Sequence, residues 1–269
     1  MTISILGCGW LGLPLAWRLQ QKGYEVKGSR TSEAGARQLL AQGIKGYAIA
    51  LGAQEITGDD NFWQADILVI NIPPPRNNPE QLHVQQANLL IEKIAGKGSI
   101  QQVLFISSTS VYANNNAIVT EEDTIPPNKA SGRALRTIET LLMKQKQFST
   151  TVLRAGGLIG YDRMPNTTAR LSLSRDWDAP MNVIHRDDLI GIIDTVIHHQ
   201  VWGELFNACM DGHPARRAYY RAAATLFGFQ LEEPPPATGT PFKLVSTEKL
   251  RKSLQYHFIT DDPLQLFNT

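Results

Sequence analysis

Short apolar runs alternate with longer amphipathic stretches along the first 155 residues of the chain. The runs contain the β-branched and other apolar residues that a strand buried on both faces of a sheet requires. Between them, apolar residues recur at the spacing of one helix face. We expect strands at Ile3–Leu6, Tyr24–Gly28, Lys45–Ala50, Ile67–Ile70, Val103–Ser107 and Thr150–Arg154. We expect helices at Leu11–Gln21, Ser32–Ala41, Pro79–Ala95 and Ser131–Gln145.

This alternation predicts the fold class. Parallel strands need long crossover connections, which are usually helices, so the pattern favours a parallel sheet. We therefore predict an α/β protein with a Rossmann domain at residues 1–160. Such a domain is a doubly wound parallel sheet with helices on both faces.

The pattern becomes irregular after Gly160, and residues 161–180 are mostly polar. An apolar run at 182–184 then precedes a helical pattern over 187–199, which Asp187 or Asp188 would cap. Further elements are expected at Glu204–Ala208, Pro214–Phe227 and 242–254. We predict a small C-terminal substrate lobe at residues 161–269, from which residues 183–210 return to the Rossmann sheet.

Charge and composition narrow the partners that the chain could bind. Lys and Arg number 26 against 25 Asp and Glu, which gives no electrostatic basis for binding nucleic acid or a membrane surface. Neither a signal peptide, a transmembrane segment nor a zinc-ligand spacing is expected. Cys8 and Cys209 lie too far apart to suggest a disulfide framework. We expect a cytoplasmic protein without a metal that binds a small-molecule substrate.

The strongest motif is G-x-G-x-x-G, between the first predicted strand and helix. Its glycines permit a tight turn, leave space for a pyrophosphate and let helix and strand pack closely, while the helix N-terminus offers amides to the phosphates. A plain turn or a methyltransferase loop are the alternatives. The predicted cofactor-binding residues of this loop are Gly7, Cys8, Gly9, Trp10, Leu11 and Gly12.

The choice of cofactor is indicated at the end of the second strand. NAD-binding domains usually place an acid there for the ribose hydroxyls, whereas this strand ends in Ser29 and Arg30. A guanidinium and a hydroxyl suit a 2′-phosphate, so we favour NADP over NAD. Two alternatives stay open. Arg30 could be a solvated charge at the start of a helix, and Glu33 could fold back toward a ribose.

Several segments carry a resemblance to a known family. VLFISSTSVYA (103–113), LRAGGLIG (153–160), NVIHRDDLIGII (182–193) and GELFNA (203–208) follow the glycine loop in this order. Together they resemble the extended short-chain dehydrogenases/reductases, the NAD-dependent epimerase/dehydratase family, and in detail its atypical YeeZ-like members. The resemblance implies that Ser108 is the catalytic hydroxyl residue. It also implies cofactor contacts from Ile72, Pro73, Ser107, Arg154, Ala155 and Gly156.

The chain departs from this family at the proton-transfer group. Family members use a Tyr-x-x-x-Lys pair one helical turn apart, where the lysine lowers the pKa of the phenol. None of the seven tyrosines has a lysine four residues later, and the alignment puts Ser131 and Leu135 at the two positions. Substitutes to consider are Tyr112, Lys129, Arg133 and His185, each of which also has an ordinary structural explanation.

Two classes of function follow. The first is an atypical oxidoreductase or epimerase that binds NADP (or NAD) and acts on a small or sugar-derived substrate. The second is a catalytically silent NADP-binding sensor or regulatory protein. The resemblance also implies a homodimer through the helices at Pro79–Ala95 and Ser131–Gln145.

Overall fold

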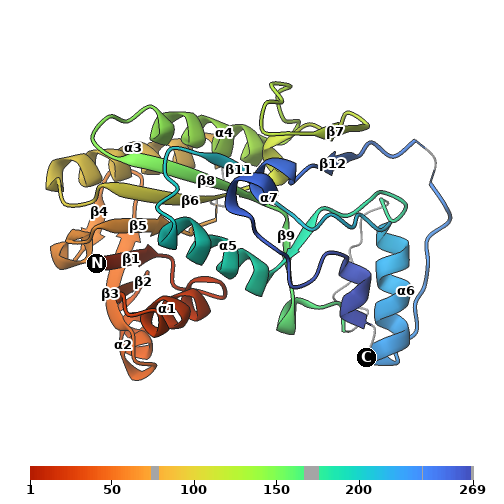
Figure 1. Ribbon diagram of the computed structural model, residues 1–269, viewed down its shortest axis with the longest axis horizontal. Helices are drawn as coiled ribbons and strands as arrows, with labels where there is room; N and C mark the ends of the chain where they lie inside the picture. The colour runs from red at the N-terminus through yellow and green to blue at the C-terminus, as the bar shows by residue number, and fades with distance from the viewer. Residues whose placement is uncertain (74–78, 167–175, 238, 268–269) are drawn as a thin grey trace.

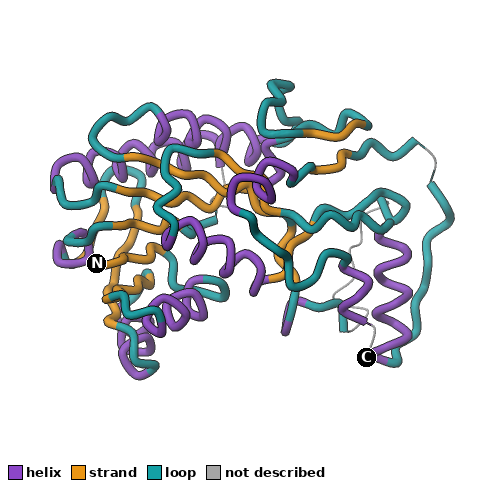
Figure 2. Tube along the Cα trace, viewed as in Figure 1, coloured by secondary structure: helices purple, strands orange, loops and turns teal. Residues whose placement is uncertain are grey.

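The computed structural model describes residues 1–73, 79–166, 176–237 and 239–267. Figures 1 and 2 show a central sheet with helices on both faces, beside a smaller group of helices that includes the C-terminal end. Among the described residues, no helix combines the length and the apolar character needed to cross a membrane.

The main sheet has eight strands among the described residues, in the order β11-β8-β6-β5-β1-β2-β3-β4. Every neighbouring pair is parallel except β3 and β4. The carboxyl ends of the parallel strands therefore meet along one edge. The strands are β1 (Thr2–Leu6), β2 (Glu25–Arg30), β3 (Lys45–Leu51), β4 (Ile56–Gly58), β5 (Ile67–Ile70), β6 (Gln102–Ser108), β8 (Ser149–Ala155) and β11 (Leu205–Ala208).

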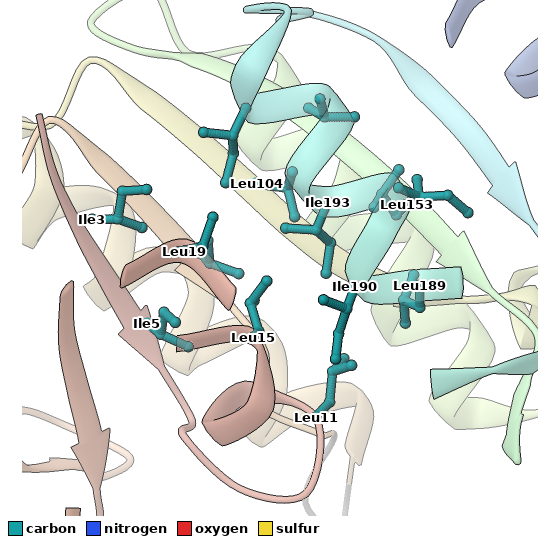
Figure 3. Close-up of a cluster of buried hydrophobic side chains, with 14 of the residues drawn as sticks. Ile3, Ile5, Leu11, Leu15, Leu19, Leu104, Leu153, Leu189, Ile190 and Ile193 are labelled. Carbon is teal, nitrogen blue, oxygen red and sulfur yellow. The ribbon is translucent and has the colours of Figure 1, made fainter. Parts of the chain in front are cut away.

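The helices divide between the two faces of the sheet, as a doubly wound fold requires. On one face α1 (Gly12–Gln21), α2 (Glu33–Ala41) and α5 (Arg186–His198) enclose a buried aliphatic cluster. Figure 3 shows Leu15 and Leu19 of α1 lying between β1 and Ile193 of α5. On the other face α3 (Pro79–Lys97) packs against α4 (Ala130–Met143) over a second cluster. The predicted α/β fold class is confirmed.

The predicted strands and helices of the first 160 residues are present, with ends that differ by one or two residues. Of the two edge strands, β11 is the strand expected at Glu204–Ala208, and it pairs with β8, whereas β4 was not predicted. Sequence reasoning also missed β7 (Ala117–Val119) and β9 (Gly157–Ile159), because three residues are too few to show a periodic pattern. Part of the irregular stretch 161–180 lies outside the described residues.

The C-terminal half contributes to several parts of the molecule. β10 (Val183–His185) pairs with β9 rather than with the main sheet, while β12 (Lys243–Val245) pairs with β7. α6 (Arg216–Phe227) and the 3-10 helix η5 (Pro263–Phe267) enclose a third apolar cluster. α7 (Glu248–Leu254) packs on β11. The division into domains at residue 160 stays a prediction.

The cap of α5 corrects one expectation. His185, not Asp187 or Asp188, is the N-cap, and its Nδ1 accepts a hydrogen bond from the Asp187 amide at 3.3 Å. Asp188 is fully buried and accepts from the Ile259 amide at 2.7 Å and from the Tyr256 hydroxyl at 3.1 Å. Asp188 therefore ties the C-terminal segment to α5.

Candidate functional site

A cavity of about 720 Å³ opens at the carboxyl edge of the sheet, beside the glycine loop. It extends from the ends of β2 and β3, past the start of α1, to the ends of β6 and β8. Its lining includes most of the residues predicted from the sequence: Gly7, Cys8, Gly9, Trp10, Leu11, Ser29, Arg30, Ile72, Pro73, Ser107, Ser108, Ala155 and Gly156. Gly12 and Arg154, also predicted, are not among the lining residues.

The three motif glycines meet different surroundings. Gly7 has φ +98°, and a Cβ atom there would collide with the main-chain oxygen of Asn71. A Cβ at Gly12 would lie 2.5 Å from the Gly7 oxygen, so Gly12 sits beneath the loop instead of in the cavity. A Cβ at Gly9 would have no atom within 4 Å. Gly9 therefore leaves open space on the side that faces the cavity.

Neighbouring strands hold this loop in place. The Gly7 amide donates to Ser29 Oγ at 3.0 Å, and the Cys8 amide donates to the Ser29 main-chain oxygen at 2.8 Å. Asn71, which the sequence analysis did not single out, donates from Nδ2 to the Gly7 oxygen at 3.0 Å. Ser29 is only 2% exposed, so its hydroxyl supports the loop.

The start of α1 is arranged to receive an anion. Its N-cap is Leu11, which makes no side-chain capping hydrogen bond, and its first turn contains no acidic residue. The first amides of a helix have no partner within the helix and carry the positive end of the helix dipole. The Leu13 amide donates to the Gly9 oxygen at 3.0 Å and Pro14 has no N–H group, so a phosphate group at this position would accept from the amides between Gly9 and Leu13.

The β2 side of the cavity is basic and partly apolar. Arg30 lies there, and its Nε atom is buried without a hydrogen-bond partner among the described residues. The described lining contains two arginines, Arg30 and Arg163, and no carboxylate. Burial raises the pKa of the neighbouring Cys8 thiol to about 12, although the charge of Arg30 acts in the opposite direction.

The β6 side of the cavity holds two serines and the start of the segment after β8. Ser108 lines the cavity, and its Oγ accepts a hydrogen bond from the Ser110 amide at 3.1 Å. No described residue accepts a hydrogen bond from this hydroxyl, so its proton can be donated to a ligand. Leu135, at the family's lysine position, also lines the cavity. An apolar side chain thus occupies the place where the family's charged amine would lie.

Arg154 is a correction to the predicted site. Its side chain is 5% exposed and forms an ion pair with Glu139, with 2.7 Å between Nη2 and Oε2. It also donates to the Tyr112 hydroxyl at 2.7 Å. Successive residues of a strand point to opposite faces, so Leu153 and Ala155 join the cluster beside α1 while Arg154 points toward α4. Arg154 therefore links β8 to α4 on the face of the sheet opposite α1.

The four suggested substitutes for the missing tyrosine do not line the cavity within the described structure. Tyr112 is buried beside Arg154, and burial raises its pKa to about 12. Arg133 pairs with Glu80 at 2.6 Å, and Lys129 is exposed at the start of α4. His185 caps α5. In the described parts of the chain, no cluster of His, Cys, Asp and Glu is suited to hold a metal ion.

An aromatic and basic cluster lies beside the glycine loop, and two of its members, Trp10 and Arg163, line the cavity. The guanidinium of Arg163 lies 4.1 Å from the centre of the Trp10 ring, and Trp10 Nε1 donates to Asp162 at 2.5 Å. The guanidinium of Arg186 lies 3.8 Å from the centre of the Tyr161 ring. Sequence reasoning missed Arg163, because only the fold brings this distant segment back to the loop.

Comparisons with known proteins give the relationship of the chain. No protein-family model matches it. Protein YeeZ of Escherichia coli K12 is 30% identical in an alignment of 270 positions that covers 97% of each chain.

Solved structures extend the comparison. A proposed NAD-dependent epimerase/dehydratase from Methylobacillus flagellatus is 27% identical, with a TM-score of 0.73 over 99% of this chain and 96% of its own. A short-chain dehydrogenase/reductase superfamily protein from Agrobacterium tumefaciens, solved with bound NAD, has a TM-score of 0.76 at 16% identity over 99% and 96%. The chain belongs to the YeeZ family, and it shares its fold with proteins described as NAD-dependent epimerases/dehydratases and short-chain dehydrogenases/reductases.

Proposed function

We propose that the chain binds a nicotinamide dinucleotide in the carboxyl-edge cavity and prefers NADP. Three features fit such a ligand: open space above Gly9, uncapped amides at the start of α1, and a volume of about 720 Å³, within the range of cofactor pockets. The glycine loop would hold the pyrophosphate, with the adenosine half toward β2 and β3. The nicotinamide half would then lie toward Ser108 and Gly156.

The preference for NADP rests on Arg30. Its Nε is a buried donor without a partner among the described residues, which is costly unless a ligand supplies an acceptor. A 2′-phosphate offers acceptor oxygens and two negative charges, and a guanidinium binds phosphates well. No carboxylate in the described lining competes for the guanidinium or binds the ribose hydroxyls.

For chemistry, we propose an atypical oxidoreductase or epimerase. Bound NADP supplies hydride transfer at the nicotinamide ring. The Ser108 hydroxyl, with its lone pair engaged by the Ser110 amide, would donate a hydrogen bond to the reacting oxygen of a small or sugar-derived substrate. Proton transfer would have to come from solvent or from the substrate, because the described lining contains no tyrosine, lysine, histidine or carboxylate.

The absence of a proton-transfer group from the described lining favours a second candidate, a catalytically silent NADP-binding sensor. A cavity that holds the cofactor, and whose described lining has no group that titrates near neutral pH, can report the redox state of NADP without turning over a substrate. Binding would then be its whole function.

Calorimetric titration with NADPH and NADH tests the cofactor. We expect tighter binding of NADPH, and Arg30→Gln should weaken NADPH by at least 10-fold while changing NADH little, since only the 2′-phosphate contact is lost. Arg37→Gln, at an exposed arginine on α2, is the matched control. Equal losses of both dinucleotides in the Arg30 variant would reject the 2′-phosphate contact.

Turnover separates the two candidates. NADPH oxidation is followed with a panel of aldehydes, ketones and keto-sugars, using the wild type and Ser108→Ala. Turnover that falls sharply in the variant at unchanged NADPH affinity supports the enzyme. A redox-dependent change in NADP affinity with no turnover across the panel supports the sensor.

A further inference from the structure

Gln86 lies on α3 at the β3 end of the cavity, and one hydrogen bond fixes the direction of its amide. Nε2 donates to the main-chain oxygen of Leu51 at 2.8 Å. A carbonyl oxygen can only accept, so the nitrogen of the amide must face Leu51. The Oε1 atom therefore points away from Leu51, and no described residue donates a hydrogen bond to it.

The surroundings of Gln86 are apolar. Ile49 and Leu51 of β3 and Ile72 after β5 line the same end of the cavity. An apolar slot with a single fixed polar group is typical of a site that binds a flat ring and sets its orientation. Here that polar group is an acceptor, since the donor half of the amide is already engaged.

The direction of the dinucleotide follows from the proposed function, on which this inference rests. With the pyrophosphate at the start of α1 and the 2′-phosphate at Arg30, the base lies farther along the edge, beside β3. That position is the slot formed by Ile49, Leu51, Ile72 and Gln86.

We propose that Gln86 selects adenine, because its Oε1 accepts a hydrogen bond from the 6-amino group. A 6-oxo purine would place a carbonyl oxygen against Oε1. Rotating the amide to offer its nitrogen instead would break the bond to Leu51 and bring two oxygens together. Gln86 thus favours a 6-amino purine over a 6-oxo purine, because its hydrogen bond to Leu51 keeps Oε1 turned toward the base.

The test uses NADPH and its hypoxanthine analogue, in which a 6-oxo group replaces the 6-amino group and N1 carries a hydrogen. Dissociation constants are measured by calorimetry for the wild type, Gln86→Met and Gln85→Met. Wild type should bind NADPH about 10-fold more tightly than the analogue, as expected for one hydrogen bond and one unpaired acceptor. In Gln86→Met the ratio should fall to near one. Gln85, exposed on the same helix, should leave the ratio unchanged.

The ratio of two affinities on one protein cancels any general loss of folding or of binding. A wild type that binds both dinucleotides equally, or a Gln86→Met variant that keeps the wild-type ratio, would overturn the role of Gln86. A wild type that binds neither dinucleotide would instead reject the proposed function itself.

Discussion

Gly9 and Gly12 differ in what an added methyl group would meet, so the same substitution at the two positions should have opposite effects. A Cβ at Gly9 finds no atom within 4 Å, and Gly9 does not have a positive φ. Gly9→Ala should therefore leave the fold intact, and the stability should be unchanged or rise by up to about 1 kcal/mol. The new methyl group would, however, occupy the space through which a pyrophosphate reaches the amides of α1.

Losing one charge-assisted hydrogen bond costs about 1.5–3 kcal/mol, which corresponds to roughly a 10-fold to 100-fold weaker affinity. Gly12→Ala places its Cβ 2.5 Å from the Gly7 oxygen, so the loop must shift at a cost of about 1–3 kcal/mol. That cost lowers the melting temperature by roughly 2–4 °C for each kcal/mol. Thermal melts and NADPH titrations of both variants are the assay. A Gly9→Ala variant that binds NADPH as tightly as the wild type would refute this reasoning.

Three further predictions concern Arg163 beside the glycine loop, the buried ion pair between Arg154 and Glu139, and the buried His83. Arg163→Gln should weaken NADH and NADPH by the same factor in titrations, because a cation beside Trp10 lies near the pyrophosphate that both share; selective loss of NADPH would contradict this. Glu139→Gln should cost about 3–5 kcal/mol in urea unfolding because it leaves buried Arg154 without a carboxylate partner, whereas Glu80→Gln, in an exposed pair, should cost much less; similar costs would refute the distinction. Burial lowers the pKa of His83 from 6.5 to about 4, so the unfolded chain binds more protons between these values and stability falls as pH drops through them, by at most about 1.4 kcal/mol per pH unit. His83→Leu should flatten this slope in urea unfolding measured from pH 7 to 4, while His198→Leu, at an exposed site, should retain it.

The sequence predicted the features that depend on neighbouring residues. The glycine loop is an example, because Gly7, Gly9 and Gly12 act within one strand, turn and helix whose hydrophobic pattern is clear. The order of strands and helices was predicted for the same reason. These local features led to the fold class and to the part of the cavity lining formed by the glycine loop, Ser29 and Arg30, while the family resemblance led to Ile72, Pro73, Ser107, Ser108, Ala155 and Gly156.

The remaining site residues depend on the tertiary fold. Asn71, Gln86 and Arg163 contact the loop or the cavity from segments that are far from residues 7–12 in the sequence, so their position became visible only in the assembled sheet. Arg154 was placed wrongly because a resemblance gives the end of a strand but not which face each residue takes. The cap of α5 was wrong by two or three residues, because His185 can accept a hydrogen bond as an aspartate does.

The central claim is that the start of α1 holds a dinucleotide pyrophosphate, and a crystal structure of the chain grown with NADPH tests it most directly. We predict electron density for the pyrophosphate against the amides that follow Gly9, with the 2′-phosphate within hydrogen-bonding distance of Arg30. Density for NADPH at another position, or a loop that stays free of it at millimolar NADPH, would contradict the account.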